Sequence, residues 1–557
     1  MDKILSYWLV CLILTAIHGA GCSASGQVSP NNPSLIWQSE DTSTDTHVAF
    51  RGIFSLAGDG LADIQLSGAS WYVVWLDGEY FYEGPDRYTS AYPEYQSKKV
   101  TLSKGDHLIA VQVHYEGIET RILKVIQPFL LCRLLLQDNE IPIIWKCEQL
   151  NGFERTNFRI NAELGWVEWV DTRKLPENWQ TINFDDSKWK IPVEVKRDLG
   201  AFSRSKIGNV KALEIIPKVI AEGKLAEIYG YEKDNPSARF FLRDLACDKL
   251  PPQGVWKRYD LGRVRLARPK FVMDLPEGAV VEFAYSESLS HGRVAPWITL
   301  SASDSYNLDH FVARGGRQEF FPVHPKGGRF VEVHILAPVT EIKFVEEKFI
   351  ERTYYDQPKG DFRCNDELLN KIWRTGIETY KACSEDALID NPTRERGQWL
   401  GDMGVGMRIG AAGFSDISIC RRGLVQSAQC ARNDGMLAGF IPAAYQPEAV
   451  AYIKKHILNC FPNNPSAPRL SDPAANNPQL ITPYFSHFAF EVLIEQGEIN
   501  FVLDQYRKCW GWALEDDRTT WIEVFDTRWS NCHQWAGSPT WQLSTVESNM
   551  RSKPLNR

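Results

Sequence analysis

The chain has 557 residues, of which 44% are hydrophobic and 24% are charged. This length exceeds one ordinary domain and predicts about three, each able to bury a core. The net charge of −8 argues against nucleic acid or an anionic membrane surface as the main partner. The 19 tryptophans favour sugar binding only weakly, because β-rich cores use aromatic side chains as well.

Residues 1–21 have the pattern of a secretory signal peptide. Lys3 supplies the positive charge, residues 4–17 are nearly all apolar, and small residues follow. The apolar run is too short for a comfortable membrane-spanning helix. Gly-Ala-Gly-Cys is similar to a bacterial lipoprotein box, which makes Cys22 a candidate for a lipid anchor; ordinary cleavage beside this cysteine is the alternative. The protein is therefore predicted to be exported to the periplasm, the outer membrane or the extracellular space.

Ten of the twelve cysteines lie outside the signal, because Cys11 and Cys22 belong to it. The ten are scattered, with no C-x-x-C pair and no Cys/His zinc spacing. We therefore predict no cofactor, and buried thiols for most of these cysteines. One or two disulfides are an open alternative in an exported protein.

Residues 34–205 predict a β-sandwich, since short strands alternate with turns. Residues 71–76 and 79–82 flank Asp77-Gly78, a dipeptide that supplies the positive φ angles of a tight hairpin. A second hairpin is predicted within residues 100–111.

Residues 206–352 predict a second β-sandwich, with half-buried alternation along residues 278–287. After Pro358 the period changes to that of helices, which predicts a helical domain over residues 358–557. Asn365 is expected to cap the first helix, whose apolar face is Leu368, Leu369, Ile372 and Trp373. A second apolar stripe is assigned to core packing: Phe485, Phe488, Ala489, Val492 and Leu493.

The segment 390–402, D-N-P-T-R-E-R-G-Q-W-L-G-D, interrupts the helical pattern. It combines carboxylates, arginines, a tryptophan and glycines: Asp390, Arg394, Glu395, Arg396, Gly397, Trp399, Gly401 and Asp402. Pro392 and the glycines argue against a regular helix here. A loop with charge and an aromatic side chain is a typical place for chemistry. A solvated loop with surface ion pairs is the alternative.

Two later segments complete the pattern. The segment T-T-W-I-E at residues 519–523 ends in Glu523. The segment S-N-C-H-Q-W-A-G-S-P at residues 530–539 contains His533 and Trp535. Taken singly, His533 fits a structural histidine better than a ligand-binding one.

Three sequence motifs, in this order along the chain, resemble segments of the α-L-rhamnosidases, the inverting glycoside hydrolases of family 78. The motifs are D-x-P-x-R-E-R-x-x-W-x-G-D, T-T-x-x-E and S-x-x-H-x-W-x-x-x-P. The resemblance implies that Glu395 is the general acid and Glu523 the general base. It implies a sugar pocket formed by Asp390, Arg394, Trp399, Asp402, His533 and Trp535. Trp399 is expected to give Glu395 a partly apolar setting that keeps it protonated.

The resemblance also implies the fold, which is two jelly-roll-like β-sandwich domains followed by an (α/α)6-type helical barrel. Glu287 and Asp304 of the second sandwich can be paired as glycosidase carboxylates, but the family keeps its acid and base in the helical domain. No metal is expected in the acidic pocket, because Arg394 and Arg396 supply the countercharge.

The helical domain departs from the family in length. Positions Glu395 and Glu523 are separated by 128 along the chain, and a Pro/Asn/Ser-rich stretch at residues 461–468 lies where more helices are expected. The barrel is therefore predicted to be incomplete. Beside an exported α-L-rhamnosidase acting on rhamnose-containing glycans or glycosides, two alternatives stay open. One is a surface carbohydrate-binding protein without turnover, and the other is a related glycosidase for another sugar.

Overall fold

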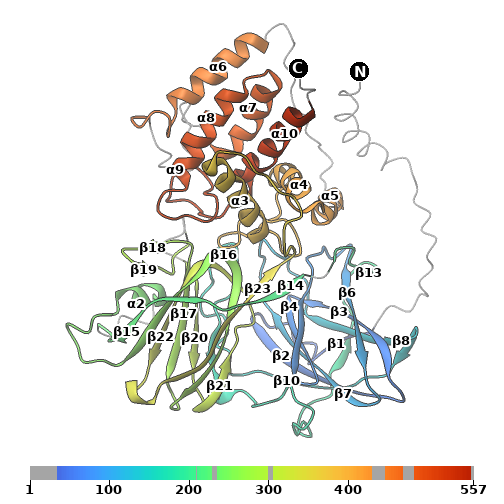
Figure 1. Ribbon diagram of the computed structural model, residues 1–557. Helices are drawn as coiled ribbons and strands as arrows, with labels where there is room; N and C mark the ends of the chain where they lie inside the picture. Colours follow the sequence, from blue (N-terminus) through green and yellow to red (C-terminus); the bar gives the residue numbers. More distant parts are fainter. Residues whose placement is uncertain are drawn as a thin grey trace. The chain divides into compact units, whose positions relative to one another are not determined.

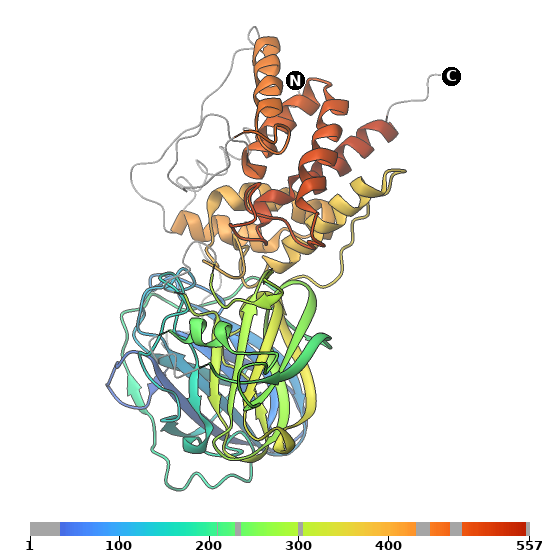
Figure 2. The ribbon, with the colours of Figure 1, turned by 90° about the vertical axis from the view of Figure 1, so that its left-hand side faces the viewer.

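The computed structural model describes residues 34–208, 210–228, 235–298, 305–429, 446–467 and 482–552. The predicted signal peptide, the candidate lipid anchor Cys22, and the residues Asp304 and Cys430 lie outside this described part. Residues 35–557 belong to one compact unit, in which two β regions lie side by side and the helices gather at one end of them (Figure 1, Figure 2).

The first β region consists of two sheets packed on each other, and their strand pairs are antiparallel except for the parallel pair β6 and β13. One sheet has the order β12-β1-β8-β3-β6-β13, with β9 beside β8, and the other has the order β10-β2-β7-β4-β5. The strands are β1 (Leu35–Trp37), β2 (Thr46–Leu56), β3 (Gly60–Ala69), β4 (Trp71–Leu76), β5 (Glu79–Gly84), β6 (Glu94–Leu102), β7 (Gly105–Tyr115), β8 (Phe129–Leu136), β9 (Asn139–Ile141), β10 (Ile144–Gln149), β12 (Val193–Val195) and β13 (Ser203–Arg204). Phe50, Ile64, Val111 and Phe129 are buried in the core between the sheets.

One of the two predicted hairpins is confirmed and the other is wrong. Strands β4 and β5 pair across Asp77 and Gly78, whose φ angles are 51° and 92°. The strands β6 and β7, by contrast, belong to different sheets, so the chain at Gly105 crosses from one layer of the sandwich to the other. A turn sequence shows that the chain reverses, but the layer to which it returns depends on which strands are free to pair.

The second β region is one sheet folded over its own core, in the order β11-β20-β17-β22-β16-β23-β14, with β15 and β21 also paired to β16. The strands are β11 (Trp169–Asp171), β14 (Lys211–Ile215), β15 (Lys218–Leu225), β16 (Gly254–Leu275), β17 (Val280–Ser286), β20 (Leu308–Val312), β21 (Gly316–Phe320), β22 (Lys326–Leu336) and β23 (Lys343–Thr353); the short pair β18 (Leu289–Ser290) and β19 (Arg293–Val294) stands apart. The long strand β16 shifts register between Asp260 and Arg265, where Gly262 has a φ of 83°. It thereby contributes to both layers of this sandwich.

The boundary between the two β regions is less simple than a single cut in the sequence. Strand β11 lies within the first predicted domain but pairs in parallel with β20 of the second. The domain limits therefore stay predictions, while the two-sandwich architecture itself is present. The short helix α2 (Pro236–Leu242) and the 3-10 turns η1 (Thr172–Lys174) and η2 (Val339–Glu341) complete the β part.

The helical part contains α3 (Glu367–Ala382), α4 (Leu400–Phe414), α5 (Ser418–Gln429), α6 (Gln446–Asn459), α7 (Pro483–Glu495), α8 (Ile499–Gln505), η4 (Tyr506–Trp510), α9 (Gly511–Ala513), η5 (Gln534–Gly537) and α10 (Ser538–Ser552). Within the described residues these helices are fewer than the six pairs of a full (α/α)6 barrel, so the barrel is incomplete. None of the helices in the described part is both long and apolar enough to cross a membrane.

Two predictions about the helices need correction. The cap of α3 is Asp366, not Asn365, because the Asp366 carboxylate accepts from the backbone N–H groups of Leu368 and Leu369. On α7 only Ala489 and Leu493 of the predicted core stripe are buried. The other three are 40–49% exposed: Phe485, Phe488 and Val492. An apolar stripe indicates a face that favours burial, but burial requires a neighbouring element.

A buried charge network joins the first sandwich to the segment before the acidic loop. Arg87, which follows β5, donates to Glu385 at 2.7 Å and to Asp386 at 3.0 Å. It also donates to the backbone carbonyl of Arg396 at 2.8 Å, and Arg396 itself pairs with Glu385 at 2.8 Å. Arg352 of β23 contacts Glu385 at 3.3 Å. Since a buried charge without its partner is costly, this network fixes the acidic loop on the β part.

Candidate active site

The acidic loop between α3 and α4 is closed on itself by Asp390. The backbone N–H of Asp390 donates to the carbonyl of Gly397 at 3.0 Å, and the N–H of Gly397 returns a bond to the Asp390 carboxylate at 2.9 Å. The amide of Asn391 donates to the second carboxylate oxygen at 2.9 Å. Both oxygens of Asp390 are thus used inside the loop, and burial raises the pKa of this carboxyl well above its usual range. The structure gives Asp390 a role in holding the loop; sugar binding by this residue stays a prediction.

Arg394 brings the two predicted catalytic carboxylates together. Its Nη2 lies 2.8 Å from Oε1 of Glu395 and 3.2 Å from Oε1 of Glu523. The two oxygens are therefore at most about 6 Å apart, the combined length of these contacts. Carboxyl groups are about 6.5–9.5 Å apart in inverting glycosidases and about 5–5.5 Å in retaining ones, so this bound does not assign the stereochemistry.

The base segment holds Glu523 by its backbone. The N–H of Glu523 donates to the carbonyl of Ser530 at 2.8 Å, and its carbonyl accepts from the indole N–H of Trp535 at 2.8 Å. The ring of Trp535 stacks on His533 with centroids 4.0 Å apart, and Tyr484 of α7 packs against it at 5.0 Å. The side chain of Glu523 therefore extends from a fixed backbone toward Arg394.

Several buried polar atoms beside this pair have no hydrogen-bond partner among the described residues: Asp402 Oδ1, Glu523 Oε2, His533 Nδ1, Arg394 Nε, Gln534 Nε2 and Gln534 Oε1. His533 lies between two of these side chains, with Nδ1 at 3.7 Å from Asp402 and Nε2 at 4.0 Å from Glu523. Burial keeps the pKa of His533 well below its usual range, so the ring is neutral. Unsatisfied buried donors and acceptors are costly in a core, and they are suited to a ligand rich in hydroxyl groups.

Trp399 contacts Glu395, the predicted acid, through its indole N–H. Its indole N–H donates to Oε2 of Glu395 at 3.2 Å, and its ring, 40% exposed, carries the guanidinium of Arg121 at 5.1 Å. Trp399 also lines a cavity of about 300 Å³ that extends over Arg121 and Lys124. The tryptophan therefore forms part of the surface next to the acid, and it binds Glu395 through a hydrogen bond.

Glu287, which the sequence offered only as a less favoured glycosidase carboxylate beside Asp304, holds two segments of the site together. Its carboxylate accepts from the hydroxyl of Thr393 in the acidic loop at 2.8 Å and from the hydroxyl of Ser530 at 3.1 Å. It also accepts from the backbone N–H of Asn531. Glu287 therefore ties the loop that carries Glu395 to the segment that follows Glu523. No local pattern could have indicated this contact, since the three segments lie far apart along the chain.

We expect Glu287→Ala to lower kcat by about 10–100-fold with a smaller change in KM, because both catalytic segments lose a shared anchor. Glu287→Gln keeps one acceptor oxygen and should recover part of the loss. The matched control is Glu347→Ala, which removes an ion pair with Lys257 at 2.9 Å in the same sandwich. Steady-state kinetics and thermal melting of all three variants test this. Equal kcat values for Glu287→Ala and the control would refute the positioning role.

Burial raises the pKa of Asp402 to about 7, and the carboxylates of Glu523 and Glu395 act in the same direction. The unfolded carboxyl titrates near pH ~4, so the folded state holds an extra proton between about pH 4 and 7. Stability is therefore lost as the pH rises through this window. We expect Asp402→Asn, which cannot ionise, to gain stability relative to the parent between about pH 5 and 8, by up to about 4 kcal/mol. Melting temperatures of both proteins across this range test the sign, and a difference independent of pH would contradict it.

The nine cysteines in the described part are free thiols, and six of them are buried: Cys147, Cys383, Cys420, Cys460, Cys509 and Cys532. This confirms the prediction of mostly buried thiols for the cysteines that the structure describes.

Residues 357–459 match a family model described as the bacterial alpha-L-rhamnosidase 6 hairpin glycosidase domain. Among solved structures, the chain is similar to the GH78 family rhamnosidase of Bacillus sp. GL1, with a TM-score of 0.74 and 15% identity over 93% of this chain and 92% of that chain. It is also similar to the α-L-rhamnosidase from Dictyoglumus thermophilum, with a TM-score of 0.51 and 17% identity over 94% of this chain and 57% of that chain.

A third similar structure is the Streptomyces avermitilis α-L-rhamnosidase complexed with L-rhamnose, with a TM-score of 0.51 and 17% identity over 91% of this chain and 53% of that chain. The chain thus spans little more than half of the second and third structures. No curated protein matches it.

The fold and the matched domain define the class of the protein, which is an α-L-rhamnosidase-like glycoside hydrolase. The matched domain is that of the family whose motifs the sequence resembles. The chain carries the six-hairpin domain of the α-L-rhamnosidases on the fold of a family 78 enzyme, with a shortened helical barrel.

Proposed function

We propose that this protein hydrolyses terminal α-L-rhamnosyl linkages with inversion of configuration. The observation that carries the pairing of the two carboxylates is the contact of both Glu395 and Glu523 with one nitrogen of Arg394, in a chain with the rhamnosidase six-hairpin domain. Inversion is proposed from the resemblance of the motifs to the inverting enzymes of family 78. Glu395 protonates the leaving oxygen, and Glu523 takes a proton from a water that attacks the opposite face of the sugar.

The surrounding residues suit this division of roles. Glu523 is buried and held by its backbone, so its carboxylate keeps one position relative to the sugar. Glu395 lies on a loop fixed by Asp390 and borders an open cavity through Trp399, the side from which a leaving group can depart. The unpartnered atoms of Asp402 and His533 are available to sugar hydroxyls.

The substrate class proposed is a rhamnose-containing glycan or glycoside, by analogy with the similar structure that was solved with L-rhamnose. An aryl α-L-rhamnopyranoside tests it directly, with the same aryl group on other sugars as the comparison. Proton NMR during turnover should show β-L-rhamnose as the first product. Release of the α-anomer first would refute inversion, and faster turnover of another sugar would favour the related glycosidase.

A second candidate is a carbohydrate-binding protein without turnover. It is favoured by the direct ion pairs of Arg394, which occupy both catalytic carboxylates, and by the exposed apolar stripe on α7 where a complete barrel would supply neighbours. Calorimetric titration with L-rhamnose distinguishes the two. Binding without any hydrolysis of the activated substrate would establish this second function.

We further propose that the protein is exported, with residues 1–21 as its signal and Cys22 as the residue that carries a lipid if the protein is anchored. The support is the sequence pattern described above. The intact mass of the mature protein from an exporting bacterial host tests this. A lipid mass that is lost in Cys22→Ser indicates anchoring, whereas an uncleaved N-terminus would refute export by this route.

A further inference from the structure

Five metal-ligating side chains gather in the β part, away from the catalytic carboxylates. Asp45, His47, His114, Glu116 and His324 are all buried, at 1–6% exposure. His114 lies on β7 and Glu116 directly after it, and residues two apart on an extended chain point to the same side. His324 precedes β22, so the cluster lies where the two sandwiches meet.

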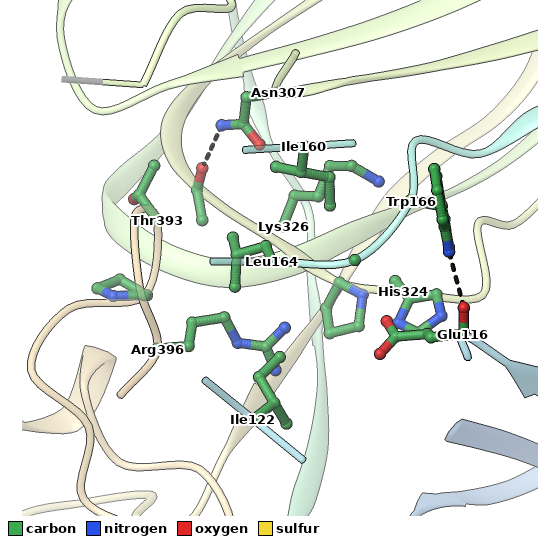
Figure 3. Close-up of a pocket in the computed structure, with 14 residues that line it drawn as sticks. Glu116, Ile122, Ile160, Leu164, Trp166, Asn307, His324, Lys326, Thr393 and Arg396 are labelled. Carbon is green, nitrogen blue, oxygen red and sulfur yellow. Dashed lines mark hydrogen bonds between the residues drawn. The ribbon is translucent and has the colours of Figure 1, made fainter. Parts of the chain in front are cut away.

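The atoms of this cluster face one another. His114 Nδ1 lies 2.7 Å from His324 Nε2, and His114 Nε2 lies 2.9 Å from Oδ1 of Asp45. One ligand atom each from His114, Glu116 and His324 lies within 4.8 Å of the others. Figure 3 shows the Glu116 carboxylate beside the ring of His324, at the wall of a small cavity of about 20 Å³.

Glu116 is buried, with 6% of the residue exposed, and its hydrogen bonds within the described residues are made by its backbone, to Ser70 and from Trp166 and Asp45. The two cations that line the cavity have carboxylates of their own, because Arg396 pairs with Glu385 and Lys326 with Asp309. Buried charges are costly unless they are paired or bind a metal. Glu116 therefore forms no direct ion pair in the described part, although His114 and Arg396 are near enough to act on it electrostatically.

We propose that His114, Glu116 and His324 bind a divalent transition-metal ion, with Zn²⁺ as the best match to two imidazoles and one carboxylate. Asp45 holds the outer nitrogen of His114, which is the arrangement that orients a metal-binding imidazole. Zinc–nitrogen bonds of about 2.0–2.1 Å place two nitrogens about 3.3 Å apart in a tetrahedral site. The His114 and His324 nitrogens thus need to separate by only about 0.6 Å from their present 2.7 Å.

The site is structural rather than catalytic. It would join β7 of the first sandwich to the segment before β22 of the second. Its cavity is also lined by Pro392, Thr393 and Arg396, so the ion would lie behind the acidic loop. Loss of the metal should therefore lower stability first, and activity only through the position of that loop.

The test uses the full-length protein with a histidine-free affinity tag. We expect close to one equivalent of zinc by mass spectrometry of the purified protein, or on addition of Zn²⁺ after dialysis against a strong chelator. Removal of zinc should lower the melting temperature by a few degrees, and Zn²⁺ should restore it. Glu116→Gln and His324→Ala should each weaken zinc binding by at least about 10–100-fold, and Asp45→Asn by about 10-fold or more.

The matched control is His107→Gln. His107 lies near the start of β7, away from His114, and is paired with Asp77. This variant should bind zinc like the parent. The alternative is a plain hydrogen bond between His114 and His324 with no ion. A protein that neither retains zinc nor gains stability from added Zn²⁺ would establish that alternative, as would zinc binding that Glu116→Gln and His324→Ala leave unchanged.

Discussion

Glu523→Gln is expected to lower kcat by about 10²–10⁴-fold on every substrate, whatever its leaving group. The attacking water loses its base, and a better leaving group does not replace a base. Glutamine is a suitable replacement because it keeps an oxygen for the 3.2 Å contact with Arg394 and for the polar surroundings of the pocket. The measurement is kcat on an aryl α-L-rhamnoside and on a rhamnose-containing disaccharide.

The control for this variant is Glu515→Gln, an exposed carboxylate on the segment that leads to Glu523. It should leave kcat unchanged. Retention of more than about one tenth of the parental kcat in Glu523→Gln would show that this residue is not the base.

Glu395→Gln is expected to lower kcat far more on the disaccharide than on the aryl glycoside. On the disaccharide kcat should fall by about 10²–10⁴-fold, since the departing alcohol must be protonated. On an aryl glycoside with an acidic phenol the loss should be much smaller, because that leaving group departs with little assistance. Glutamine also preserves an acceptor for the indole N–H of Trp399, now 3.2 Å from the carboxylate.

Glu523→Gln serves as the counterpart, because its losses should be equal on the two substrates. Equal losses for Glu395→Gln would remove this residue from the acid role. If the parent protein binds L-rhamnose but hydrolyses neither substrate, both glutamates are sugar contacts only.

Much of the architecture could be predicted because local patterns are strong where a segment contacts its own neighbours. The Asp77-Gly78 turn required two positive φ angles, and the structure has them. The same kind of turn signal failed for the strands on either side of Gly105, because the sequence does not show which sheet a strand will join. Asp366 rather than Asn365 caps α3, since adjacent residues of similar chemistry compete for one position.

The candidate site shows the same division more sharply. The sequence by itself determined that an acidic loop, a later glutamate and a histidine segment follow in the order of the α-L-rhamnosidases, because these are short motifs with fixed spacing. Only the tertiary structure decided that Arg394 contacts both Glu395 and Glu523. It also showed that the Asp390 carboxylate binds the backbone of its own loop, and that Glu287 of the second sandwich contacts both segments. The cluster of His114, Glu116 and His324 likewise has no spacing that a motif could show. The contacts of Arg394 with Glu523, of Glu287 with Thr393 and of His114 with His324 join residues more than a hundred positions apart. They depend on the packing of whole domains rather than on any local preference of the chain.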